Sequence, residues 1–245
     1  RLRNLCIVSS NLDEFFEVRA AAHLTAAQQG ETKGEYSVAS FEALAEKAHQ
    51  LVARQYELYN DSLTPAFEAH RIRVVSHSER SSAQKRWVRE YFQRDVRPLL
   101  IPVGLDPSHP FPQVANKSLN FIVRLKGGDA FGRQNEIAIV KIPRILPRVI
   151  RLPLDVAPQG VQLVTLSSII RSHLADLFPG REVSEFSQFR VTRHSDLAVD
   201  EEDVRNLRMA LRQGLQHRHY GQAVRLEVSA SCSRYLAEFL QVQFS

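Results

Sequence analysis

Apolar residues recur every three or four positions through the first 97 residues, which is the spacing of amphipathic helices. One such stripe begins at Phe41 and comprises Leu44, Ala45, Ala48, Leu51, Val52, Tyr56 and Tyr59. Pro65 fits the first turn of a following helix, and the polar residues 28–37 predict a loop. Ser82 is the expected N-cap of a third long helix that carries Trp87, Val88, Tyr91, Phe92 and Val96. Because these helices are close in sequence, we expect an antiparallel bundle over residues 1–97.

The pattern changes at a proline-rich stretch. Prolines at positions 98, 102, 107, 110 and 112 exclude a regular helix there, and we take this stretch as the junction between two domains. After the stretch the apolar period is two, which predicts strands at 119–125, 137–142, 149–152, 186–192 and 224–228. Helices are predicted at 166–178, 200–219 and 234–242. Strands interleaved with helices predict an α+β domain with a mixed sheet over residues 98–245.

Composition places the chain among water-soluble globular proteins. Its 245 residues are 44% hydrophobic and 24% charged, and no apolar run is long enough to cross a bilayer. The two cysteines, Cys6 and Cys232, lie at opposite ends, which fits a reducing, cytoplasmic location. The chain begins without Met and in the middle of an amphipathic segment, so we expect a partial chain. A net charge of +5 permits a polyanionic partner without requiring one.

The most unusual segment is Ser-Ser-Asn-Leu-Asp-Glu-Phe-Phe-Glu-Val-Arg at 9–19. Ser10 and Asp13 have the spacing of a capping box, which predicts a helix that starts here with Asn11 beside its N-terminus. A carboxamide at that place can donate and accept hydrogen bonds on the edge of a nucleobase. The alternative is that Asn11 only caps the helix while Phe15 and Phe16 fill the core.

The acids of this segment are the nearest approach to a metal site in the sequence. Asp13 and Glu17 share a helix face, and Glu14 turns away. Capping and the helix dipole account for the first two acids, so we expect no metal site. None of the nine histidines is assigned as a phosphoryl acceptor, and the sequence has no phosphate-binding loop of the GxxxxGK[ST] type.

Several anchors in order along the chain resemble polyphosphate kinase, the bacterial enzyme that polymerises the terminal phosphate of ATP. They are the whole segment 1–19, Leu-Asp-Pro-Ser-His-Pro-Phe-Pro at 105–112, Lys-Ser-Leu-Asn at 117–120, Val-Lys-Ile-Pro-Arg-Ile-Leu-Pro-Arg at 140–148, Phe-Arg-Val-Thr-Arg-His-Ser-Asp-Leu at 189–197, Val-Asp-Glu-Glu-Asp at 199–203 and Gly-Gln-Ala-Val-Arg-Leu-Glu-Val at 221–228.

The resemblance implies an N-terminal helical domain followed by a head domain. The family's two C-terminal phospholipase-D-like domains, which hold its phosphorylated histidine and its Mg²⁺ ligands, have no counterpart before Ser245. We therefore expect this portion alone to be inactive. The resemblance implies that Asn11 contacts the adenine of ATP. It further implies polyphosphate as a substrate, a dimer or tetramer, and a peripheral membrane association of the full enzyme.

A cluster of basic residues is the second candidate site. Lys141, Arg144, Arg148 and Arg151 lie within eleven residues, and Arg190 and Arg193 come from a nearby predicted strand. Guanidinium groups bind phosphate through paired hydrogen bonds, so Lys141, Arg144, Arg148, Arg190 and Arg193 are candidate phosphate or polyphosphate contacts. The alternatives are a solvated basic surface or a subunit interface.

Two other functions remain open at this point. One is a non-catalytic module for oligomerisation or polyphosphate binding. Nucleic-acid binding is the weaker one, because the basic residues are not interleaved with aromatics as single-strand binders require, and we expect no nucleic acid.

Overall fold

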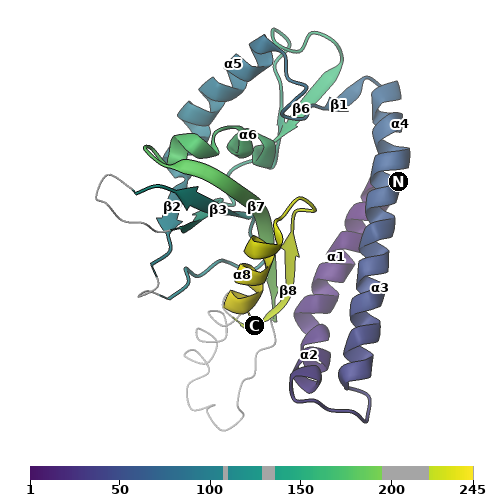
Figure 1. Cartoon of the computed structure of the whole chain (residues 1–245). Coiled ribbons are helices and arrows are strands. Elements are labelled where there is room, and N and C mark those ends of the chain that lie inside the picture. The colour runs from purple at the N-terminus through teal and green to yellow at the C-terminus, as the bar shows by residue number, and fades with distance from the viewer. Residues whose placement is uncertain (107–109, 129–135, 195–220, 245) are drawn as a thin grey trace, which may run out of the picture.

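The computed structural model describes residues 1–106, 110–128, 136–194 and 221–244. The chain begins with a layer of long helices that stands beside an α+β region (Figure 1). The helical elements are α1 (Leu2–Val18), α2 (Ala20–Gln28), α3 (Val38–Glu57), the π-helical turn η1 (Leu58–Leu63) and α4 (Thr64–Ala69). Helices α1 and α2 run antiparallel to α3 and bury Leu12, Phe16 and Ala20 against Ala48.

The predicted start of a helix at Ser10 is wrong. Helix α1 already begins at Leu2, so Ser10 and Asn11 lie in its interior. Apolar residues at helical spacing, including Leu5, extend upstream of Leu12 and keep that stretch helical. Burial of Leu12 and Phe16 stabilises the helix, and each residue added upstream gains a backbone hydrogen bond, which together outweigh the cap preference of one serine.

Capping and proline positions explain the other helix boundaries in this layer. Ser37 and Ser40 form a reciprocal capping box at the start of α3. The loop predicted at 28–37 is present between α2 and α3, over residues 29–37. Pro65 lies in the first turn of α4, as expected, but η1 joins α3 and α4 into one rod. A π turn pairs Thr64 N–H with Tyr59 C=O one residue before the proline, which has no N–H of its own.

The third predicted helix does not join the bundle. Helix α5 (Ser82–Tyr91) is capped by Ser81 rather than Ser82 and continues through η2 (Phe92–Val96) and η3 (Arg97–Leu99). Its buried face, which includes Val88 and Phe92, packs into the core of the α+β region. Hydrophobic spacing predicted the helix but carries no information on which partner it packs against. The domain boundary at residue 97 stays a prediction.

Two sheets form the α+β region. The larger sheet is antiparallel, in the order β2 (Ile101–Gly104), β4 (Ile137–Lys141), β3 (Asn120–Lys126), β7 (Glu182–Arg193), β8 (Ala223–Val228). The smaller sheet is mixed: β6 (Val161–Thr165) pairs parallel with β1 (Ile72–Val74) and antiparallel with β5 (Val149–Arg151). The predicted class, a helical region followed by an α+β region with a mixed sheet, is confirmed.

Helices cover both faces of the larger sheet. Helix α8 (Arg234–Phe244) lies on one face and packs on Ile122, Phe189 and Val191 (Figure 1). Helix α5 and α6 (Leu166–Ser172), the latter continued by η4 (Leu174–Leu177), cover the other face over β3 and β4. Helix α1 contacts β7 and β8 at the end of the sheet.

One predicted helix and the membrane-span expectation concern the rest of the chain. The helix predicted at 200–219 lies outside the described residues. No described helix is long and apolar enough to pass through a bilayer.

Candidate functional site

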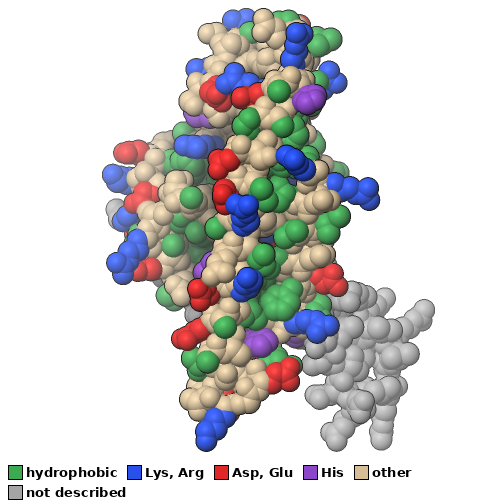
Figure 2. Space-filling view, turned by 90° about the vertical axis from the view of Figure 1, so that its right-hand side faces the viewer, with side chains coloured by type: hydrophobic (Ala, Val, Ile, Leu, Met, Phe, Trp, Pro, Cys, Tyr) green, Lys and Arg blue, Asp and Glu red, His purple; other side chains and the backbone are tan. Residues whose placement is uncertain are grey.

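Asn11 lies on the rim of an apolar groove between α1 and α3. Figure 2 shows hydrophobic side chains gathered over the long helices on this side of the molecule. The groove has a volume of about 510 Å³, and its lining comprises Val8, Asn11, Leu12, Phe15, His23, Leu44, Lys47, Ala48 and Leu51. Asn11 and Lys47 supply polar groups to this lining, and both side chains are exposed. An apolar slot with a few polar groups at its edge is the usual form of a small-molecule site.

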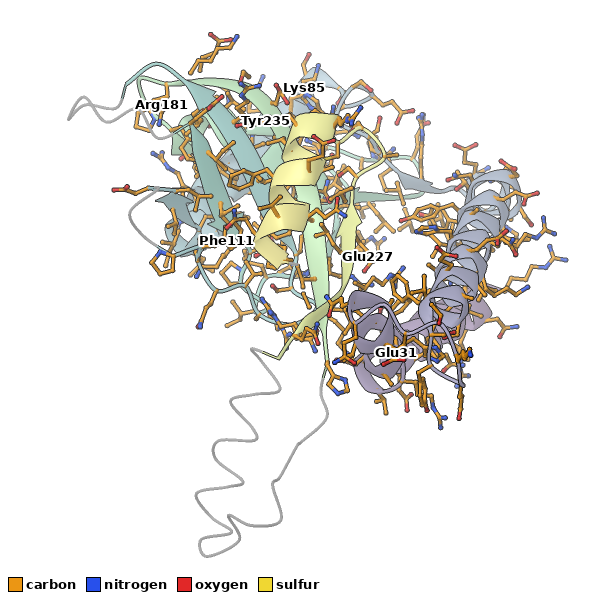
Figure 3. The ribbon with its side chains drawn as sticks, turned by 60° about the horizontal axis from the view of Figure 1, so that its bottom comes forward. Glu31, Lys85, Phe111, Arg181, Glu227 and Tyr235 are labelled. Carbon is orange, nitrogen blue, oxygen red and sulfur yellow. The ribbon has the colours of Figure 1, made fainter. Side chains whose placement is uncertain are left out.

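The opposite side of α1 is joined by ion pairs to the α+β region, which we call the head region. Asp13 accepts two hydrogen bonds of 2.8 Å from the Arg190 guanidinium, one on each carboxylate oxygen. Arg190 Nε also donates to Glu227 at 2.6 Å, across the β7–β8 pair. Glu227 lies on the side of β8 that faces the helices (Figure 3). A bidentate arginine–carboxylate pair fixes orientation as well as distance, so Asp13 sets how α1 lies on the sheet.

Arg225 completes this network beneath Phe16. Its guanidinium lies 3.1 Å from Glu227 and 3.7 Å from Asp13, and its carbon Cζ is 4.9 Å from the centre of the Phe16 ring. Burial and the positive charge of Arg190 lower the pKa of Arg225 more than the neighbouring carboxylates raise it. For Arg190 burial also opposes the charge, but the Asp13 hydrogen bonds and the Glu227 charge outweigh burial and raise its pKa. Both guanidiniums remain charged at all physiological pH values.

Glu17 makes a second junction one helical turn further along α1. Its carboxylate accepts from Asn116 Nδ2 at 2.5 Å and pairs with the Lys117 ammonium at 2.8 Å. Its carbonyl oxygen lies 2.9 Å from His194 Nδ1. Lys117 has a φ of +56°, a conformation uncommon for a residue with a side chain. Asp13 and Glu17, four residues apart, thus hold one face of α1 at two points.

Three of the predicted phosphate contacts meet the loop that precedes β3. Arg144 donates to the Asn116 carbonyl, and the backbone N–H of Arg193 donates to Asn116 Oδ1 at 2.9 Å. The Arg193 guanidinium donates to the Gly221 carbonyl at 2.8 Å. Lys141 Nζ lies 3.4 Å from the Gln113 carbonyl. The structure therefore brings Lys141, Arg144 and Arg193 to one loop. Backbone carbonyls of the loop accept from Lys141 and Arg144, whereas Arg193 donates to the Asn116 side chain and to the Val114 carbonyl.

The remaining basic residues lie apart from this loop. Arg190 faces α1, whereas its neighbours Phe189 and Val191 face α8 on the other side of the sheet. The Arg193 guanidinium lies over the Phe244 ring of α8, so Arg190 and Arg193 are on opposite sides of the sheet. Arg148 is half-buried. Burial is the main cause that lowers the pKa of Arg148, and the charge of Arg144 lowers it further. Arg148 Nη1 has no hydrogen-bond partner among the described residues. Arg151 is exposed on β5. Whether any of these groups contacts phosphate stays a prediction.

Within the described ranges no group of three or more His, Cys, Asp or Glu side chains is placed to hold a metal ion. Two of the three acids of α1 have protein cations as partners: Arg190 for Asp13 and Lys117 for Glu17. We attributed Asp13 to helix capping, and that interpretation is wrong because Asp13 lies deep inside α1. Its role is a contact between two regions of the chain.

Comparison with known proteins identifies the family. The sequence model of the polyphosphate kinase N-terminal domain matches residues 1–75, and that of the polyphosphate kinase middle domain matches residues 83–245. The chain belongs to the polyphosphate kinase family. Polyphosphate kinases of Neisseria meningitidis serogroup B and Pseudomonas aeruginosa are each 48% identical to it over 248 residues, which cover the whole chain.

The chain spans about a third of the length of these polyphosphate kinases, 36% in both cases. A solved structure, the polyphosphate kinase from Porphyromonas gingivalis, superposes with a TM-score of 0.69 over 96% of this chain and 32% of the solved chain. At 24% sequence identity this likeness establishes the fold. The resemblance inferred from the motifs is thus confirmed, and the two regions are the N-terminal and middle parts of a polyphosphate kinase.

Sequence reasoning about this polyphosphate kinase region missed the partners of Asp13 and Glu17. The signal was present, because these two acids share a helix face from which Glu14 turns away. Their partners Arg190 and Lys117 lie 177 and 100 positions away along the chain, and no local pattern links them.

Proposed function

We propose that the full-length protein containing this chain is a polyphosphate kinase that reversibly transfers the terminal phosphate of ATP to inorganic polyphosphate through a phosphohistidine. The residues described here contribute the adenine contact and subunit contacts. Mg²⁺ acts in the full enzyme through ligands outside this chain. Family membership and 48% identity to named polyphosphate kinases over the whole chain support the reaction class.

The observation that carries the adenine contact is the position of Asn11 on the rim of the apolar groove. A carboxamide accepts a hydrogen bond with its oxygen and donates with its nitrogen, which matches the N6 amine and ring nitrogen of adenine. Phe15, Leu44 and Leu51 offer apolar surface to the faces of a purine. Lys47 adds a positive charge at the same edge for an anionic group of the nucleotide. The groove volume falls within the range of about 300–1,000 Å³ typical of ligand sites.

Phosphate handling at the middle region is a separate proposal. Lys141, Arg144 and Arg148 lie near the turn that follows β4, and positive charge there favours a polyanion such as polyphosphate. Lys141 and Arg144 each donate one hydrogen bond to a backbone carbonyl. Arg190 and Arg193 donate more of theirs to the protein, Arg190 to Asp13 and Glu227 and Arg193 to the carbonyls of Val114 and Gly221. Within this proposal they contribute charge and position rather than the direct contact.

Kinetics of the full-length protein test the adenine contact. Asn11→Ala removes two hydrogen bonds to the base, and a loss of about 1.4 kcal/mol corresponds to a tenfold higher KM for ATP. The matched control is Asn4→Ala on the same helix, because Asn4 is exposed and lies outside the groove lining. Equal KM values for Asn11→Ala and wild type contradict the proposal.

A further inference from the structure

The two faces of α1 have different tasks. Asn11 and Asp13 are two positions apart, which is a rotation of about 200° around a helix with 3.6 residues per turn. Asn11 therefore turns to the groove beside α3, while Asp13 turns to β7 and β8. The residue proposed to contact adenine is thus carried by a helix whose other face is fixed to the sheet.

The fixing contacts are partly shielded from water. Side-chain exposure is 17% for Asp13, 15% for Glu17 and 13% for Arg225, whereas it is 30% for Arg190, 32% for Glu227 and 35% for Lys117. Exposed ion pairs contribute little to stability, but shielded pairs with good geometry fix position, and the loss of one partner leaves a buried charge unpaired. The Asp13 junction also contains a closed ring of four charges of alternating sign, since Arg190 and Arg225 each pair with both Asp13 and Glu227.

The junctions also control how α1 can move. A helix held by a single contact can swing about it. Contacts at Asp13 and Glu17, one turn apart on one face, fix the direction of α1 on the sheet, and rotation of α1 about its own axis would break both. Phe16 lies between the two acids in sequence, is 6% exposed, and packs over Arg225. Rotation of α1 by one residue step would move Asn11 about 100° around the helix and away from the groove.

We propose that Asp13 and Glu17 are positioning residues, which hold α1 on Arg190, Arg225, Asn116 and Lys117 so that Asn11 faces the adenine of bound ATP. This inference rests on the proposed function of Asn11. It assigns the acids of the segment 9–19 a role in ATP affinity that involves no contact with nucleotide or metal. It also assigns the head region a part in nucleotide binding through contacts with α1.

The test is a double-mutant cycle in the full-length kinase with KM for ATP as the readout. Asp13→Asn keeps the size of the side chain but removes its charge, so α1 is less firmly fixed. We expect KM to rise about tenfold and kcat to stay within about twofold, because groups that position a substrate contact act on binding. The matched control is Glu14→Gln, since Glu14 is exposed on the same helix and has no ion pair among the described residues. Wild-type KM is expected for this control.

The cycle separates positioning from simple destabilisation. If Asp13 acts through Asn11, Asp13→Asn raises KM much less in the Asn11→Ala background, because the contact it positions is already gone. Full additivity of the two substitutions, or a fall in kcat with unchanged KM, contradicts the positioning role. Glu17→Gln is a second variant that retains hydrogen-bonding capacity, and we expect a rise in KM that is also non-additive with Asn11→Ala.

The outcome also distinguishes this inference from the proposed function. A raised KM in Asn11→Ala together with wild-type KM in both Asp13→Asn and Glu17→Gln overturns the positioning role and leaves the adenine contact intact. Wild-type KM in Asn11→Ala overturns the adenine contact itself and removes the premise of the inference.

Discussion

At the residue scale, the turn before β6 depends on a single glycine. Gly160 has a φ of +73°, and a Cβ at this position would overlap the carbonyl oxygen of Arg71. Arg71 itself has a φ of +58°, and its carbonyl accepts a hydrogen bond of 2.8 Å from Val161 N–H. Two chain segments in left-handed conformations thus meet backbone to backbone, and neither has room to move away without loss of the β1–β6 pairing.

Gly160→Ala should lower the free energy of unfolding by about 3 kcal/mol, from left-handed strain of 1–2 kcal/mol and a further cost of the overlap. The control is Gly127→Ala, with a similar φ of +82° but no atom within 4 Å of the new Cβ. We expect about 1 kcal/mol there. Urea unfolding of both variants measures the difference. Equal losses would show that the close approach of Arg71 adds nothing.

Residue identities at the candidate site were partly predictable. The side chains of Ser9–Arg19 mark this segment as unusual, and the carboxamide of Asn11 suits a nucleobase on chemical grounds alone. The capping interpretation was wrong because a capping box describes only four residues, while the apolar stripe that governs α1 extends back to Leu2 and Leu5. Longer-range periodicity outweighed the local motif.

At the scale of elements, hydrophobic spacing predicted most helices and strands near their observed bounds. Strands β1, β2 and β6 were missed. Strand β1 has three residues, of which Arg73 is polar, and β2 contains Pro102 at the edge of its sheet. Short edge strands such as β1 and β2 present too few alternating positions to be recognised, and proline is tolerated mainly at such edges. Strand β6 is central in its sheet, and its five residues alternate too briefly to be distinguished from the helix that follows.

Helix α5 shows what periodicity leaves undetermined. Its spacing predicted a helix, yet its partners are the strands of the head region rather than the bundle. Phe92 is 0% exposed in that core, whereas Leu51 of α3 is 40% exposed. Both residues were assigned to helix stripes on equal grounds, so only the tertiary structure distinguishes them.

Phe92→Ala should therefore cost about 3–5 kcal/mol of unfolding free energy, because it leaves a cavity in the main core. Leu51→Ala should cost less than about 1 kcal/mol, since that side chain loses little buried area. Chemical denaturation of the two variants provides the measurement. A larger loss for Leu51→Ala would place α5 outside the main core.

At the scale of the whole molecule, the helical layer and the head region are joined through acids on α1 and bases on β7, β8 and the loop before β3. The class of fold followed from the change of apolar period at the prolines. The arrangement of the two regions did not, because ion pairs between residues 177 positions apart leave no mark in local spacing. The family resemblance implies an adenine contact for Asn11, and the structure shows the ion pairs that join α1 to the sheet and to the loop before β3.

The most direct test of this account is the base selectivity of the full-length kinase. Inosine triphosphate lacks the N6 amine to which the Asn11 oxygen is expected to bond. We expect wild-type kcat/KM for ATP to exceed that for inosine triphosphate by about tenfold or more, and Asn11→Ala to bring the ratio close to one. A ratio that is the same in wild type and Asn11→Ala would contradict the proposal that Asn11 reads the adenine base.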